Sequence, residues 1–168
     1  MNERQKLHRL VIAALFAAAI AVMTAYLLHI PIPTGGYIHL GDALIYLAAC
    51  LLPAPYAAAA AAVGAGLADL LTAPMWVVPT LIIKAVVVLP FTSRGERILC
   101  PRNAAALFLS GLISPVGYAL AACVLLGGVN AFLPQFLGTL VQAVGSGAVF
   151  VVLALALDGA KVKARLAP

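Results

Sequence analysis

The stretch Gly35-Gly36-Tyr37-Ile38-His39-Leu40-Gly41-Asp42 is a short polar interruption in a chain that is otherwise nearly all apolar. It contains three glycines, an aromatic ring, an imidazole and a carboxylate. The prolines Pro31 and Pro33 stand just before it, and proline removes backbone donors and disfavours helix in the preceding residue. We therefore expect residues 30–41 to be extended and to form the lid of a small-molecule site at one membrane face.

The composition predicts one integral membrane domain over residues 1–168. Of the 168 residues, 65% are hydrophobic and only 9% are charged, whereas a soluble domain carries about 25% charged residues. A chain this poor in charge needs lipid as the solvent for most of its surface. The three cysteines, Cys50, Cys100 and Cys123, lie far apart and form no metal or redox motif, so we expect no metal and no cofactor.

The apolar runs predict an all-α membrane protein with six helices, over residues 7–28, 42–52, 56–71, 77–89, 104–126 and 133–157. At 1.5 Å per residue the first is long enough to cross a hydrocarbon core of ~30 Å. The second is short, and apolar runs of this length are often re-entrant rather than spanning.

The basic residues decide between these two possibilities. Nine of the ten Lys and Arg residues lie in three segments: Arg4, Lys6 and Arg9; Arg94, Arg97 and Arg102; Lys161, Lys163 and Arg165. The positive-inside rule places all three segments in the cytoplasm. An even number of crossings must then separate them, so the short helix also crosses. We expect six crossings, both termini in the cytoplasm, and a multi-pass protein of a prokaryotic plasma membrane.

Three charges fall within or at the edge of the predicted membrane region, namely Asp42, Asp69 and Lys84. Ionisable side chains in a bilayer cost roughly 2.5–3.5 kcal/mol each on insertion scales and mark functional sites by default. All three lie in the outer half of the predicted topology. Lys84 either contacts a ligand or forms a structural ion pair with Asp69, and Asp42 either belongs to the site or serves as a helix cap.

Other polar and aromatic side chains fall in the same outer region. They are Tyr37, His39, Trp76, Thr80, Tyr118, Asn130, Gln135 and Gln142. Each alone could be no more than a contact between helices, but their convergence at one end predicts a substrate pocket that opens to the outside.

Rows of small residues indicate close helix packing. Ala13, Ala17 and Ala21 are spaced four apart in the first helix, and Ala57, Ala61 and Ala65 repeat the pattern in the third. Small residues at this spacing let another helix approach closely. The rows either form a docking face for a partner subunit or reflect alanine-rich composition alone.

Several motifs are missing from the sequence. It contains no GxxxxGK[ST], no HExxH, no nucleophile elbow and no clustered carboxylates, so ATP hydrolysis by this chain alone is not expected. Nothing indicates nucleic-acid binding. A small intramembrane enzyme or a structural membrane protein remains the alternative class, although an enzyme would have to rely on an aspartate paired with a histidine.

The chain resembles the substrate-binding S components of energy-coupling factor (ECF) transporters. Four features carry the resemblance: the alanine rows of the first helix, Gly41-Asp42-Ala43, Gly64-Ala65-Gly66-Leu67-Ala68-Asp69, and Pro79-Thr80-Leu81-Ile82-Ile83-Lys84. It implies a six-helix S-component bundle that is not an enzyme and that binds a vitamin-like ligand of the riboflavin, pyridoxine, nicotinate or queuosine-precursor type. It also implies docking through the alanine rows onto a transmembrane coupling subunit that works with two ATPase subunits.

Overall fold

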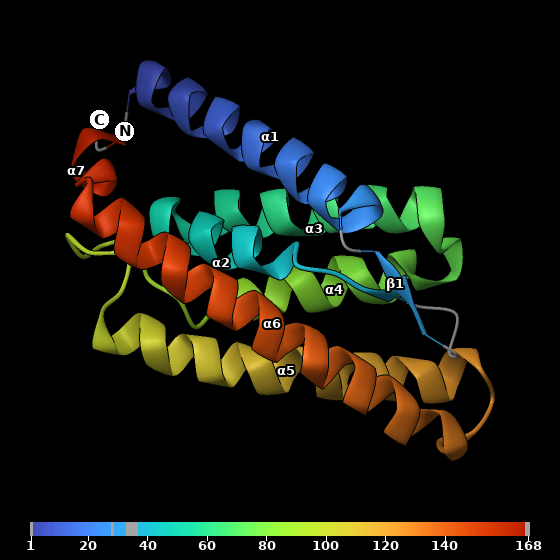
Figure 1. The fold of residues 1–168 in the computed structure, drawn as a ribbon. Helices are drawn as coiled ribbons and strands as arrows, with labels where there is room; N and C mark the ends of the chain where they lie inside the picture. Colours follow the sequence, from blue (N-terminus) through green and yellow to red (C-terminus); the bar gives the residue numbers. More distant parts are fainter. Residues whose placement is uncertain (1, 28, 33–36, 167–168) are drawn as a thin grey trace.

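The computed structural model describes residues 2–27, 29–32 and 37–166, and these form a helical bundle with one short hairpin (Figure 1). The helices are α1 (Glu3–Tyr26), α2 (Asp42–Leu51), α3 (Ala54–Thr72), α4 (Val77–Val88), α5 (Pro101–Leu125), α6 (Phe132–Gly159) and α7 (Val162–Leu166). The strands β1 (Ile30–Pro31) and β2 (Tyr37–Ile38) pair antiparallel. The 3-10 helices η1 (Pro74–Trp76) and η2 (Val129–Ala131) lead into α4 and α6.

Local sequence explains where the helix ends differ from the expected ones. Helix α1 begins four residues earlier than expected because Asn2 and Gln5 form a capping box, in which each side chain accepts from the other residue's backbone N–H. The hairpin β1–β2 and the terminal helix α7 were not expected from the sequence. A turn separates α7 from α6, and Lys161 adopts a positive φ of 53° there.

The outer surface of the bundle is apolar. Among the described residues, four helical segments are long and apolar enough to cross a membrane: α1, α3, α5 and the stretch Val129–Gly159. Large hydrophobic side chains on them are freely exposed, with Val124 82% and Phe108 71% exposed. Exposed apolar surface on this scale requires a lipid environment. The chain is therefore an all-α membrane protein, as the composition predicts.

The alanine rows pack inside the subunit, which corrects the predicted docking face. Helix α1 lies against α3, and a Cβ atom added at Gly64 of α3 would lie only 2.6 Å from the backbone oxygen of Ala17. Small side chains allow this approach. The rows are consequently buried, with Ala13 and Ala17 at most 9% exposed and Ala57, Ala61 and Ala65 at most 1% exposed. Ala21 is half-buried, so five of the six residues predicted for docking are not accessible to a partner.

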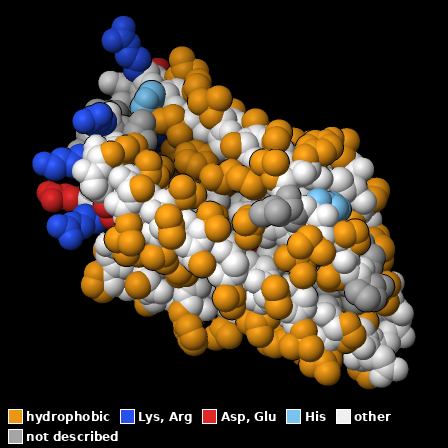
Figure 2. All heavy atoms as spheres, viewed as in Figure 1, with side chains coloured by type: hydrophobic (Ala, Val, Ile, Leu, Met, Phe, Trp, Pro, Cys, Tyr) orange, Lys and Arg blue, Asp and Glu red, His pale blue; other side chains and the backbone are white. Residues whose placement is uncertain are grey.

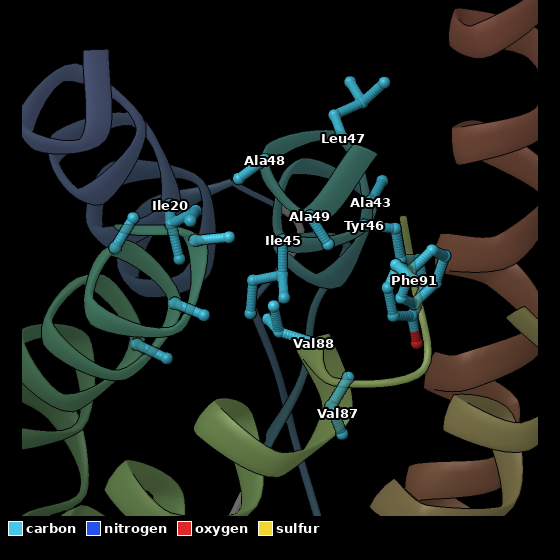
Figure 3. Packing of buried hydrophobic residues seen from close by; sticks show 14 of the residues in the cluster. Ile20, Ala43, Ile45, Tyr46, Leu47, Ala48, Ala49, Val87, Val88 and Phe91 are labelled. Carbon is cyan, nitrogen blue, oxygen red and sulfur yellow. The ribbon is translucent and has the colours of Figure 1, made fainter. Parts of the chain in front are cut away.

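Helix α2 occupies the middle of the bundle. It packs against α1, α3, α4 and α6. Its buried side chains form the hydrophobic core together with Val87 and Val88 of α4 (Figure 3). The Tyr46 ring stacks on Phe91 at 5.4 Å and meets Phe150 of α6 edge-on at 5.8 Å. Because α2 is enclosed on all sides, its first residue, Asp42, is completely buried.

The basic residues gather at the end of the bundle where both termini lie (Figures 1 and 2). The head of α1, the loop between α4 and α5, and the end of α6 meet there around a common cavity. Asp158 of α6 ties the loop in place, since its two carboxylate oxygens accept from the backbone N–H groups of Ile98 and Leu99 at 2.7 and 2.9 Å. The charge segregation that the sequence predicts is thus present in the fold.

Candidate functional site

A buried ion pair lies at the centre of the polar residues. Lys84 of α4 donates to both carboxylate oxygens of Asp42, at 2.7 and 2.9 Å, and the two side chains are 1% and 0% exposed. Gln142 of α6 donates to the same carboxylate at 3.0 Å. Three helices that are distant in sequence therefore meet at one carboxylate. The predicted alternative, an ion pair between Asp69 and Lys84, is wrong, because Lys84 pairs with Asp42.

Close packing at Gly41 sets the position of this carboxylate. A Cβ atom at Gly41 would lie 2.0 Å from Thr24 Oγ1 of α1, so a residue with a side chain would force the Thr24 side chain to move. The absent side chain lets α2 begin deep in the bundle, directly after the extended segment that follows β2. This is the physical reason for a glycine before the aspartate, and Asp42 lies in the first turn of α2 instead of capping it through its side chain.

Tyr118 of α5 links the ion pair to the neighbouring polar residues. The Lys84 ammonium lies 5.0 Å from the centre of the Tyr118 ring, a distance at which a cation is attracted to an aromatic face. The Tyr118 hydroxyl is 2.7 Å from Thr80 Oγ1. On its other side the ring lies 5.9 Å from the indole of Trp76. Tyr118 is thus held by Lys84 and Thr80 and presents its ring beside Trp76.

The hairpin β1–β2 and the described residues beside it, 29–32 and 37–39, lie at the end of the bundle opposite the basic residues (Figure 1). We call these residues the covering segment. The imidazole of His29 stacks on the Tyr37 ring at 3.9 Å, and the Tyr37 hydroxyl donates to Asp69 of α3 at 2.5 Å. Ile32 packs on α6, where a Cβ at Gly138 would lie 3.1 Å from it. The segment is therefore fixed to both α3 and α6. Residues 33–36, which belong to the predicted lid, lie outside the described residues.

Hydrogen bonds define the tautomer of His39. Its Nδ1 accepts the backbone N–H of Gly41 at 3.0 Å, and its carbonyl accepts from Ser146 of α6 at 3.3 Å. Because Nδ1 accepts, it carries no proton, and the ring proton is on Nε2. That N–H is the group His39 can offer to a ligand.

A small cavity lies among these side chains. It is lined by Tyr37, His39, Asp69, Trp76, Tyr118, Gln135, Thr139 and Gln142. Its volume is about 30 Å³, roughly the space of one water molecule, whereas ligand pockets measure about 300–1,000 Å³. The cavity in the described conformation is thus too small for a ligand of vitamin size.

One wall of the cavity carries an unused hydrogen-bond donor. Trp76 is 2% exposed, and its Nε1 has no hydrogen-bond partner among the described residues. Leaving a buried donor unpaired costs about 1–3 kcal/mol. An acceptor atom of a ligand in this cavity would satisfy the indole N–H and recover that cost.

Most of the residues predicted for the site converge on this cavity, with four exceptions. Seven of them line it: Tyr37, His39, Asp69, Trp76, Tyr118, Gln135 and Gln142. Asp42, Thr80 and Lys84 lie directly behind the wall, where they hold Gln142 and Tyr118. Asn130 is exposed on η2 and does not line the cavity.

Two polar residues of α6 were missed from the sequence. Thr139 accepts from Gln135 at 3.2 Å and lines the cavity, and Ser146 holds the His39 carbonyl. Together with Gln142 they form one stripe, at positions 135, 139, 142 and 146. Spacings of three and four place residues on the same helix face. The signal was therefore present in the sequence as a four-residue polar stripe on an otherwise apolar helix.

Comparisons with known proteins show the family of the chain. A family model described as "ECF-type riboflavin transporter, S component" matches residues 4–159. A Pyrococcus woesei protein described as "Uncharacterized protein in gap 3'region" is 36% identical over 129 residues, which covers 73% of this chain and 83% of that protein. The family match spans α1, apart from Glu3, through α6 and includes every residue of the cavity. The chain belongs to the family of ECF-type riboflavin transporter S components.

Proposed function

We propose that this S component binds riboflavin in the cavity beneath the hairpin β1–β2 and passes it to a coupling subunit with two ATPase subunits. S components are substrate-binding subunits of transporters and not enzymes. Trp76 carries the proposal, because it lines a cavity with further aromatic and amide groups and its Nε1–H has no partner among the described residues. Riboflavin offers a planar ring for stacking and several acceptors. Pyridoxine, nicotinate and a queuosine precursor are the competing ligands.

The proposed topology has six crossings with the basic end in the cytoplasm. The grouping of basic side chains at one end supports this orientation. The ten residues of α2 cover only about 15 Å, half of a ~30 Å hydrocarbon core. The covering segment then fills the other half, where its irregular backbone is tolerated because protein surrounds it. The cavity consequently faces the outside.

Binding is proposed to require an outward movement of the covering segment. The Tyr37–Asp69 hydrogen bond and the His29–Tyr37 stack hold this segment closed. Both contacts join the segment to itself or to α3, and neither involves the Asp42–Lys84 pair. The segment can therefore open while the ion pair keeps the inner wall in place.

Docking on the coupling subunit is proposed to use the exposed side of α1. Ala14 and Ala18 are four residues apart and both exposed, next to the exposed Leu15 and Val22. Small residues at this spacing allow a second helix to approach closely in a membrane. This row replaces the buried row of Ala13 and Ala17 as the contact for a partner.

The only tryptophan of the chain provides a direct test. Because Trp76 lines the cavity, its emission reports occupancy when the purified protein in lipid nanodiscs is titrated with riboflavin. We expect saturable quenching at one ligand per protein, with no reversal by excess pyridoxine or nicotinate. Quenching by one of these competitors in place of riboflavin would reject riboflavin as the ligand. No response to any of them would reject the site.

A further inference from the structure

A second cavity lies at the basic end of the bundle, away from the proposed riboflavin site. Its volume is about 710 Å³. The head of α1, the end of α2, the loop at residues 93–97, the end of α6 and the start of α7 form its walls. Nothing in riboflavin binding uses this cavity, so its chemistry must be considered separately.

Positive charge dominates the cavity wall. Five cationic side chains line it: Arg9, Arg94, Arg97, Lys161 and Lys163. The carboxylates in the wall are Glu96 and Asp158, and both oxygens of Asp158 are already occupied by backbone N–H groups. Within the described part of the chain, no salt bridge joins Arg94, Arg97, Lys161 or Lys163 to a carboxylate. The wall is thus suited to an anion.

Chain geometry directs the C-terminal lysines toward the loop. Lys161 turns the chain with its positive φ, and Lys163 then donates to the backbone oxygen of Arg97 at 3.3 Å. Partial burial lowers the pKa of Lys163, because desolvation disfavours its charged form. An anion in the cavity would offset that desolvation. Lys163 is therefore held at the cavity wall, where a bound anion would stabilise its charged form.

The cavity adjoins lipid-facing surface. Ile12 and Leu51 contribute apolar wall, and Leu7 and Leu10 on the first turns of α1 are 62% and 58% exposed. In Figure 2 the basic side chains at this end stand next to apolar side chains. Basic pockets between membrane helices on the cytoplasmic side bind phosphate headgroups. We propose that this cavity binds the phosphate headgroup of an anionic phospholipid, whose acyl chains lie along α1.

The test is native mass spectrometry of the full chain released from nanodiscs made of equal parts phosphatidylglycerol and phosphatidylcholine. The cavity variant is R94Q/R97Q/K161Q. The matched control is R4Q/R102Q/R165Q, which removes the same charge from residues outside the cavity wall. Each lost cation near the surface is worth roughly a fivefold change in anionic-lipid binding. We expect the retained ratio of phosphatidylglycerol to phosphatidylcholine to fall at least ~tenfold further in the cavity variant than in the control.

Further measurements distinguish a lipid headgroup from the other partners that this basic cavity could bind. The variant R94K/R97K keeps the charge and should keep the lipid preference, which shows that loss in the glutamine variant is not misfolding. An equal loss in both glutamine triples would overturn the proposal, since general surface charge would explain it. Full displacement of the lipid by soluble glycerol phosphate would overturn it in favour of a free phosphate. Unchanged lipid retention with lost binding to the coupling subunit would overturn it in favour of a protein contact.

Discussion

Removing Lys84 alone should destabilise the protein far more than removing Lys84 and Asp42 together. The two side chains are 1% and 0% exposed and share two hydrogen bonds of 2.7 and 2.9 Å. Lys84→Met leaves a completely buried carboxylate without its cation, which typically costs about 3–5 kcal/mol. For a chain of this length that corresponds to a fall in Tm of roughly 6–20 °C. Adding Asp42→Asn removes the unpaired charge and should recover at least half of the loss.

The assay is thermal unfolding of each variant in the same detergent, followed by circular dichroism. Lys6→Met is the matched control, because Lys6 pairs with Glu3 at 2.6 Å with side chains 49% and 88% exposed. An exposed pair of this kind contributes at most about 1 kcal/mol, so its Tm should change by less than about 4 °C. A double variant as unstable as the sum of its single variants would refute the buried-pair reasoning.

The same variants show whether Lys84 positions Tyr118 or contacts the ligand directly. Lys84 lies behind Tyr118 and does not line the cavity. The double variant should therefore bind riboflavin within about tenfold of the wild type, since the loss of one neutral contact is worth about 1 kcal/mol. A loss of roughly 2–5 kcal/mol in affinity would instead show that Lys84 contacts the ligand directly.

Three further changes test other parts of the structure. Gly64→Ala should lower the free energy of unfolding by about 1–3 kcal/mol, because the added methyl group forces α1 away from α3. The control Gly111→Ala, where a Cβ would have nothing within 4 Å, should raise it by roughly 0.5–1 kcal/mol in the same thermal unfolding assay. Ala14→Trp with Ala18→Trp should abolish co-purification with the coupling subunit while riboflavin binding persists, and intact co-purification would place docking elsewhere. Tyr37→Phe removes the hydrogen bond to the α3 carboxylate and should speed riboflavin release about tenfold in stopped-flow quenching; unchanged release would argue against closure by this contact.

Features set by composition and by chain breaks were predictable from the sequence. The segregation of basic residues, the breaks before residues 42, 54 and 74, and the gathering of polar side chains at one end all depend on where polar residues occur along the chain. Lipid penalises a misplaced charge strongly, so position along the chain nearly determines depth in the membrane. This is why seven predicted residues line one cavity.

Features set by the rotation of helices were not predictable. The sequence places Asp42 and Asp69 in the same half of the membrane as Lys84, and only the rotation of the helices decides which of them forms the pair. Similarly, α1 has small residues on two adjacent rows, and the rotation of the helix buries Ala17 while exposing Ala18. The hydrophobic pattern carries little information about rotation when nearly every position is apolar.

The most direct test of the riboflavin site is the affinity of Trp76→Phe, measured by the quenching of riboflavin's own fluorescence. This change keeps an aromatic ring beside Tyr118 but removes the Nε1–H, which has no partner among the described residues. We predict about tenfold weaker binding, the value of one hydrogen bond to a buried donor. The control Tyr26→Phe, at a position 68% exposed, should bind as the wild type does. Equal affinity of Trp76→Phe and the wild type would contradict the proposed site.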